Sequence, residues 1–135
     1  MTTLTSFTFG TSLDATVTDA RPQVEAALQA EGFGIITEID LQATYKAKLG
    51  IDTDPYVILG ACNPGLSYRA IQAEPAIGAL LPCNVVLRPD PTNKARTIVE
   101  AMDPVAVLGL VDSVDVAPVA REVREKLERA VASLG

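Results

Sequence analysis

Two apolar segments, each bounded by a cysteine and a proline, place the strongest constraint on the fold. Residues 56–61 end at Cys62-Asn63-Pro64, and a second apolar run opens after Leu81-Pro82-Cys83. Short apolar runs next to turn residues predict buried strands. Asparagine suits a helix N-cap and proline suits the first helical turn, so a helix is predicted directly after Asn63. The pattern therefore predicts two strands joined through a short helix. If these strands are neighbours in the sheet, both thiols lie near one rim.

Hydrophobic periodicity and turn residues indicate the other elements. Pro22 falls inside one helical pattern, so that helix is expected to begin near Thr18 or Asp19, or to bend at the proline. A turn-rich connection at 89–93 predicts an antiparallel hairpin, and residues 103–115 stay ambiguous. Strands are predicted at 4–10, 34–39, 56–61, 84–88 and 95–102, and helices at 14–31, 41–49, from Asn63-Pro64 to just before Pro75, and 116–134.

This mixture of strands and helices predicts a single α+β domain over residues 1–135. We expect a two-layer sandwich, in which two long helices cover one face of a mostly antiparallel sheet of about five strands. That arrangement leaves the second face of the sheet without helices. A second copy of the chain is the expected cover, so a homodimer is predicted.

Composition excludes several classes of function. The formal net charge is −6 and the chain has no histidine. The negative charge argues against a nucleic-acid partner, and the lack of histidine removes the Ser-His-Asp and Cys-His catalytic arrangements. The N-terminal residues lack the pattern of a signal peptide and no apolar run is long enough to cross a membrane, so no membrane association and a cytoplasmic location are expected.

Cys62 and Cys83 are the first candidates for chemistry. A thiol just before a helix faces the positive end of the helix dipole, which favours the thiolate. Such a pair is able to exchange disulfides or to hold a soft metal. The alternative is that both cysteines are small buried hydrophobes. The spacing matches no metal-ligand motif, so neither a metal nor a cofactor is predicted.

Glu38 is the second candidate, because it interrupts an otherwise apolar strand. A carboxylate in such a place needs a partner or a cleft. Asp40 lies on the same side of the strand, and the pair would be able to share a proton or bind a cation. For Asp40, the capping of the helix at 41–49 is the favoured interpretation.

The turn after the first apolar run is the third candidate. Backbone amides at a helix N-terminus bind anions, which draws attention to Asn63 and Gly65. The leading hypothesis is a dimeric small-molecule or anion-binding module, with a site formed by Glu38, Cys62, Asn63, Gly65 and Cys83. A thiol-dependent redox or soft-metal-handling protein that uses the two cysteines is the alternative, and a purely structural domain is the third. Whether the protein is an enzyme stays open.

A family resemblance rests on these same segments. Gly32-Phe33-Gly34, the segment 58–64 (ILGACNP) and the segment 80–86 (LLPCNVV) together resemble the family called domain of unknown function 302. The resemblance implies a small α+β domain that occurs as a dimer and has no settled activity. It supports the fold and leaves the function open.

Overall fold

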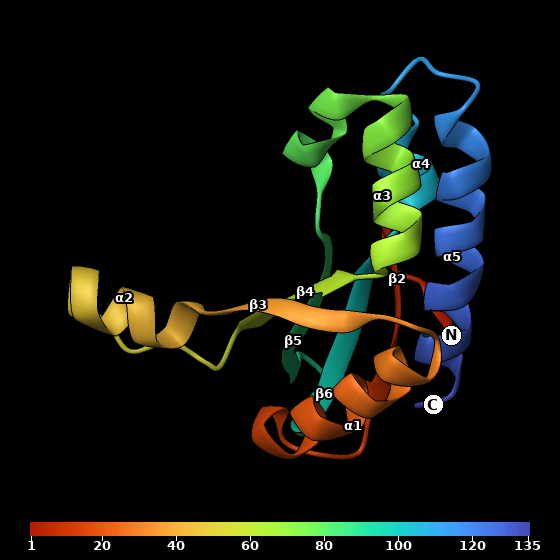
Figure 1. Cartoon of the computed structure of the whole chain (residues 1–135). Coiled ribbons are helices and arrows are strands. Elements are labelled where there is room, and N and C mark those ends of the chain that lie inside the picture. Colours follow the sequence, from red (N-terminus) through yellow and green to blue (C-terminus); the bar gives the residue numbers. More distant parts are fainter.

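The computed structural model describes residues 1–135 as one antiparallel sheet with helices packed against it (Figure 1). The strands lie in the order β1-β2-β6-β5-β4-β3, and every neighbouring pair is antiparallel. The elements are β1 (Thr2–Thr3), β2 (Thr8–Leu13), α1 (Val17–Ala30), β3 (Gly34–Asp40), α2 (Leu41–Leu49), β4 (Val57–Cys62), α3 (Pro64–Ala73), the 3₁₀ helix η1 (Pro75–Leu80), β5 (Cys83–Asp90), β6 (Asn93–Met102), α4 (Pro104–Leu108) and α5 (Val116–Ala132).

The predicted α+β fold is confirmed, with two differences near the N-terminus. The sheet has six strands, because a short β1 precedes β2, and β2 spans residues 8–13 where 4–10 was expected. The chain turns between these strands, where the amides of Leu4 and Thr5 donate to the Thr8 carbonyl. The predicted strand at 4–10 therefore includes this turn and is not one continuous strand.

Helix α1 begins at Val17, slightly earlier than expected, and contains Pro22. The side chain of Thr16 accepts a hydrogen bond from the Asp19 amide and fixes the start of the helix. Pro22 cannot donate to the carbonyl four residues earlier, at Thr18. Both residues are exposed, so water can satisfy that carbonyl and the helix continues.

One hydrophobic core of 24 buried residues lies between the sheet and the helices. The two long helices predicted from the sequence, α1 and α5, both pack on the sheet and on each other, and α3 packs beside α5. Alternate strand residues such as Leu59, Val85 and Val99 point into this core. The two central apolar strands are neighbours, since β4 pairs with β5.

The opposite face of the sheet, which we call the open face, is also rich in aliphatic residues. Its members are half-buried or exposed: Ile39, Ile58, Val86, Ile98 and Met102. The strand register places Ile39, Ile58 and Val86 in one row across β3, β4 and β5. In that row the next residue is Glu100 of β6, which binds Arg88 and Thr8.

Strand β3 runs directly into α2, and together they form an arm that projects from the body (Figure 1). Asp40 caps α2 by accepting a hydrogen bond from the Ala43 amide at 3.0 Å, which confirms the capping interpretation of this residue. Gly50 ends the helix in the left-handed conformation (φ 67°) that favours glycine. No residue of α2 is buried.

Candidate functional site

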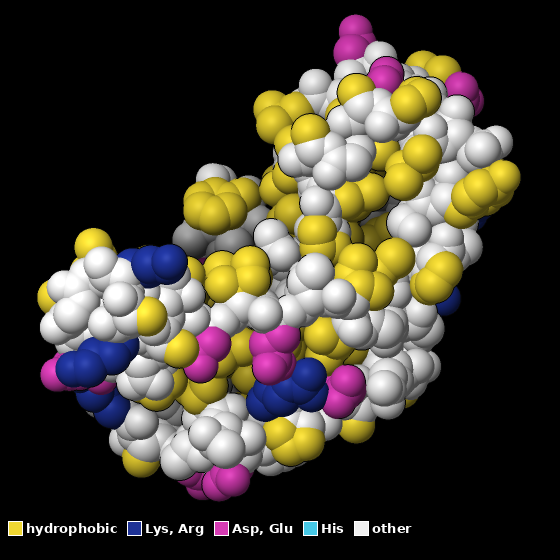
Figure 2. Space-filling view, turned by 60° about the vertical axis from the view of Figure 1, so that its left-hand side comes forward, with side chains coloured by type: hydrophobic (Ala, Val, Ile, Leu, Met, Phe, Trp, Pro, Cys, Tyr) yellow, Lys and Arg dark blue, Asp and Glu magenta, His cyan; other side chains and the backbone are white.

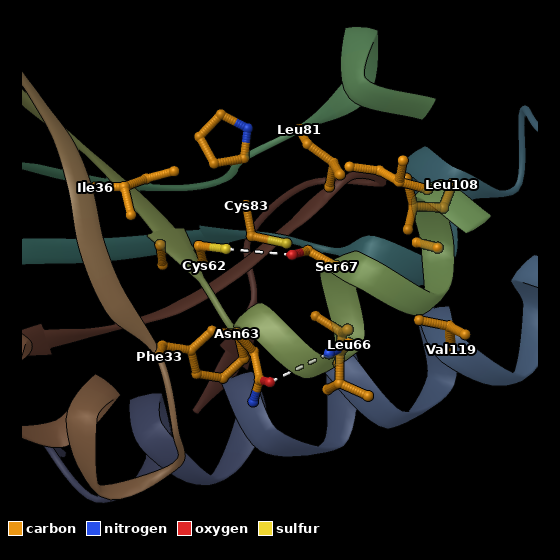
Figure 3. A pocket seen from close by; sticks show the side chains of 15 residues that line it. Phe33, Ile36, Cys62, Asn63, Leu66, Ser67, Leu81, Cys83, Leu108 and Val119 are labelled. Atoms are coloured by element: carbon orange, nitrogen blue, oxygen red, sulfur yellow. Dashed lines mark hydrogen bonds between the residues drawn. The ribbon is translucent and has the colours of Figure 1, made fainter. Parts of the chain in front are cut away.

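The cavity that brings the two cysteines together lies where β4 and β5 meet α3 and α5 (Figure 3). Its volume is about 260 Å³. Twelve of its fifteen lining residues are hydrophobic, and none carries a charge. The lining residues are Phe33, Ile36, Ala61, Cys62, Asn63, Leu66, Ser67, Ala70, Ile71, Leu81, Pro82, Cys83, Leu108, Val119 and Val123.

Local sequence explains how the strand ends form one wall of this cavity. Cys62 is the last residue of β4, and Asn63 then caps α3 by accepting a hydrogen bond from the Leu66 amide at 3.4 Å. Cys83 is the first residue of β5, and its Cα lies opposite that of Ala61 in the ladder. The two thiols therefore lie side by side on the cavity wall (Figure 3). Both are free thiols.

The two thiols have different surroundings. Cys83 is 5% exposed, and burial, with a smaller effect from nearby Cys62, raises its pKa to about 12. Cys83 is therefore a neutral thiol at physiological pH. Cys62 is half-buried, and its Sγ atom lies 3.4 Å from the Ser67 hydroxyl. The Ser67 hydroxyl also donates to the Pro64 carbonyl at 3.2 Å.

Glu38 lies away from the cavity. Its Cα is opposite that of Leu59 in the ladder, and its carboxylate accepts a hydrogen bond of 2.6 Å from Arg21 of α1. Hydrogen bonds to Glu38 and then to Glu25 raise the pKa of Arg21. The Glu38 carboxylate, which as a charged group in an apolar strand requires a partner, is thus paired with Arg21. The two side chains form an ordinary ion pair at the surface.

Gly65 also lies outside the cavity lining, on the exposed side of the helix start. Pro64 has no amide hydrogen, Asn63 accepts from Leu66, and the Ser67 amide donates to the Asn63 carbonyl. Only the Gly65 amide is left without a partner in this first turn. A single amide with no adjacent cation is a poor anion site, because anion-binding helix termini present several amides.

The same residues offer little to a metal. No group of three or more cysteine, aspartate or glutamate residues is arranged to hold a metal ion, and the chain has no histidine. None of the helices combines the length and hydrophobicity that crossing a bilayer requires.

Of the five predicted site residues, the structure brings Cys62, Asn63 and Cys83 to one cavity. Sequence reasoning did not predict that Phe33, Ile36, Leu108 and side chains of α3 and α5 line the same cavity. Val119 and Val123 belong to the apolar stripe that predicts α5. A stripe of this kind indicates a buried face, but it does not show that the packing leaves a space.

Comparisons with known proteins bear on the fold. The family model described as domain of unknown function DUF302 matches residues 9–134. No match was found among curated proteins. A crystal structure of an uncharacterized conserved protein DUF302 from Bacillus stearothermophilus is similar over 96% of this chain and 98% of that one, with a TM-score of 0.86 and 22% sequence identity. The chain therefore belongs to the DUF302 family.

Proposed function

We propose that this protein binds a small apolar molecule in the cavity next to Cys62 and Cys83. The observation that carries the proposal is the cavity itself, with its hydrophobic lining and its lack of charged side chains. Ligand sites are concave, mostly apolar and supplied with a few polar groups that fix orientation. Asn63, Ser67 and the thiols are the polar groups here.

The volume limits the size of the ligand. An apolar cavity of about 150 Å³ stays dry and accepts benzene. The cavity of this protein, at about 260 Å³, is large enough for one ring with a short substituent or for a short aliphatic chain. Of the predicted small-molecule and anion ligands, the uncharged lining favours the neutral one. The same lining offers no acid or base beyond the thiols, which favours binding over acid–base catalysis.

The test is a titration with indole followed by backbone NMR. We expect amide shifts to cluster at residues that line the cavity, such as Cys62, Ser67 and Cys83, and we expect inorganic phosphate to produce none. In Ser67→Leu the larger side chain fills part of the cavity, so indole affinity should fall at least about tenfold. Ser67→Ala is the matched control, since it also removes the hydroxyl but adds no volume.

Two results would contradict the proposal. One is that indole shifts no cavity amide at millimolar concentration. The other is that Ser67→Leu, shown by circular dichroism to be folded, binds indole as well as Ser67→Ala does.

We further propose that the protein works as a homodimer in which the arm of each copy lies on the other. Isolated helices shorter than about 12–15 residues are marginal in water. Helix α2 has nine residues and none is buried, while Leu49 is 65% exposed and Ile51, just after the helix, is 47% exposed. An arm of this kind gains stability when its apolar side chains are covered.

Charge and symmetry favour a second copy as the cover. Helix α2 contains Lys46 and Lys48 and no acidic residue, whereas the whole chain has a net charge of −6. Lys46 pairs with Asp52 of its own chain, so Lys48 is the cation of this helix that is left to attract the acidic body of another copy. In a two-fold dimer both copies make the same contact, so two arms and two open faces are covered at once.

Sedimentation velocity at micromolar concentration tests the dimer. We expect the unmodified protein to sediment as a dimer and Leu49→Glu to sediment as a monomer. Leu110→Glu is the matched control, because Leu110 is an exposed leucine (78%) outside the arm and the open face. A monomeric unmodified protein, or equal behaviour of the two variants, would contradict the proposal.

The proposal includes a cytoplasmic location, supported by two thiols that remain free although they lie close together. The redox or soft-metal alternative has less support. Cys83 is held as a neutral thiol by burial, and thiol exchange and metal binding both need the thiolate.

A further inference from the structure

We propose that Cys62 captures apolar α,β-unsaturated carbonyl compounds covalently after they enter the cavity. This inference rests on the proposed function, because the cavity must first take up the apolar part of the molecule. It adds a class of ligand and a point of modification. Two structural features support it: the two thiols differ in exposure, and the Cys83 thiol, which has no hydrogen-bond partner, faces the same cavity.

Cys62 is the more exposed of the two thiols that line the cavity. Its side chain is half-buried and lines the cavity, so one side meets the ligand space while the residue keeps contact with solvent (Figure 3). Cysteine is intrinsically among the most nucleophilic side chains. A bound electrophile therefore meets a competent nucleophile with no further catalyst.

Ser67 is placed to assist this reaction. Its hydroxyl donates to the Pro64 carbonyl, so it accepts the Cys62 S–H at 3.4 Å. When the thiol loses its proton, the same hydroxyl can turn and donate to the sulfur or to an oxygen of the ligand. A hydrogen-bond donor near developing negative charge lowers the barrier of such additions.

The buried thiol of Cys83 also points to a ligand in the cavity. Only 5% of Cys83 is exposed, and its side chain faces the cavity. Its Sγ atom makes no hydrogen bond in the structure. A ligand with a carbonyl group would supply the missing acceptor for its S–H. The raised pKa of Cys83 keeps it a thiol, so it contacts the ligand without competing for it.

The addition of the thiol to the double bond requires no oxidant, reductant or other reactant besides water. The Cys62 thiol gives its proton to water, and its sulfur forms a bond to the β-carbon of the unsaturated carbonyl compound. The electron pair of the carbon–carbon π bond moves to form an enolate, which takes a proton from water at the α-carbon. The sum is addition of S–H across the double bond, with no change in net oxidation state.

The surroundings of the cavity are apolar. None of its lining residues carries a charge. Figure 2 shows hydrophobic side chains around a depression in the upper part of the molecule, while most Lys and Arg side chains in this view lie in the lower part. An apolar electrophile would partition into this region, while a polar electrophile of equal intrinsic reactivity would not. This difference is what the experiment measures.

The experiment compares N-phenylmaleimide with N-(2-hydroxyethyl)maleimide, each at several concentrations, with adducts located by peptide mass spectrometry. Each rate is divided by the rate with glutathione, which removes the intrinsic reactivity of the reagent. We expect the phenyl reagent to be favoured at least about tenfold at Cys62, with a rate that saturates, because binding precedes reaction. Cys62→Ser should give no adduct, and Cys83→Ala should keep the preference.

The variants of Ser67 and a competitor separate the two proposals. Ser67→Leu should lose the preference for the phenyl reagent, and Ser67→Ala should keep a saturable preference with a slower maximal rate. Indole should slow the phenyl reagent only. Equal normalised rates for the two reagents, or labelling at Cys83, would overturn the covalent capture. If indole still binds in that case, the cavity proposal stands; if indole does not bind, both fail.

Discussion

The side chain of Thr37 occupies the space directly over Gly60 on the neighbouring strand. The two residues are partners in the β3–β4 ladder, and a Cβ atom added to Gly60 would collide with the Thr37 Oγ1 atom. The same added atom would also lie 2.8 Å from a side-chain carbon of Pro82. Gly60 is therefore required by close packing from both sides, while its backbone conformation is one that any residue can adopt.

We predict that Gly60→Ala lowers the free energy of unfolding by about 1–3 kcal/mol, the usual cost of overpacking a filled site. Gly34→Ala is the matched control on the adjacent strand, because an added Cβ there meets no atom within 4 Å. Urea denaturation of both variants measures the difference. Equal stabilities would show that Thr37 and Pro82 move aside freely.

The ion pair between Arg88 and Glu100 on the open face gives a second prediction. The Glu100 side chain is 11% exposed, and it accepts hydrogen bonds from Thr8 at 2.9 Å and from Arg88 at 3.2 Å. Arg88→Met leaves that carboxylate without its cation, so we expect a loss of about 1–3 kcal/mol in unfolding free energy.

The control for this prediction is the exposed pair between Arg69 and Glu122, whose side chains are 53% and 44% exposed. Arg69→Met should change stability by less than about 1 kcal/mol, as exposed pairs do. Thermal denaturation of both variants distinguishes the two environments. A loss at Arg69 as large as at Arg88 would contradict this account of burial.

Thr97 carries the third prediction. It is fully buried, and its hydroxyl donates to the Ala15 carbonyl at 2.8 Å, which holds the loop before α1 against β6. Thr97→Val keeps the shape but removes the donor, so the unfolding free energy should fall by about 1–3 kcal/mol. Native-state hydrogen exchange should also show faster exchange at the start of α1. Unchanged exchange there would mean that the carbonyl finds another partner.

Cys83 gives a prediction about pH. Its pKa in the folded protein is about 12, above the ordinary value of 9.0, so folding favours the protonated thiol. The resulting stabilisation is complete below about pH 9 and is lost as pH rises toward 12. The loss should be on the order of 2 kcal/mol near pH 11.

Tyrosine and lysine also titrate in this range, so the measured quantity is the difference between the unmodified protein and Cys83→Ala. That difference in unfolding free energy should shift in favour of the variant between pH 8 and pH 11. A difference that stays constant with pH would show that the thiol is more accessible than the structure indicates.

Local signals in the sequence predicted most of the fold. The central strand pair, the hairpin between β5 and β6, the Asn63 and Asp40 caps and the long α5 helix all depend on near neighbours in the chain. The start of β2 was misplaced because the Thr and Phe residues at 4–10 favour a strand even where the chain forms a turn. Only the register with β6 decides between these two.

The candidate site was predictable only in part, for a similar reason. Cys62 and Cys83 could be placed together because paired strands carry them. Glu38 was expected beside them, but whether a carboxylate finds a cleft or a surface arginine depends on how α1 packs, and Arg21 lies far from it in the sequence. The empty volume depends on packing among six separate helices and strands, and no local pattern encodes it.

Strand β3 connects the cavity to the arm. One end of it carries Ile36 at the wall of the cavity, and the other end passes into α2 at Asp40 with no intervening loop. A displacement of the arm is therefore expected to shift Ile36, and a ligand that moves Ile36 is expected to shift the arm. If so, the proposed association of two copies and the proposed binding of a ligand in the cavity are thermodynamically linked, each altering the equilibrium constant of the other.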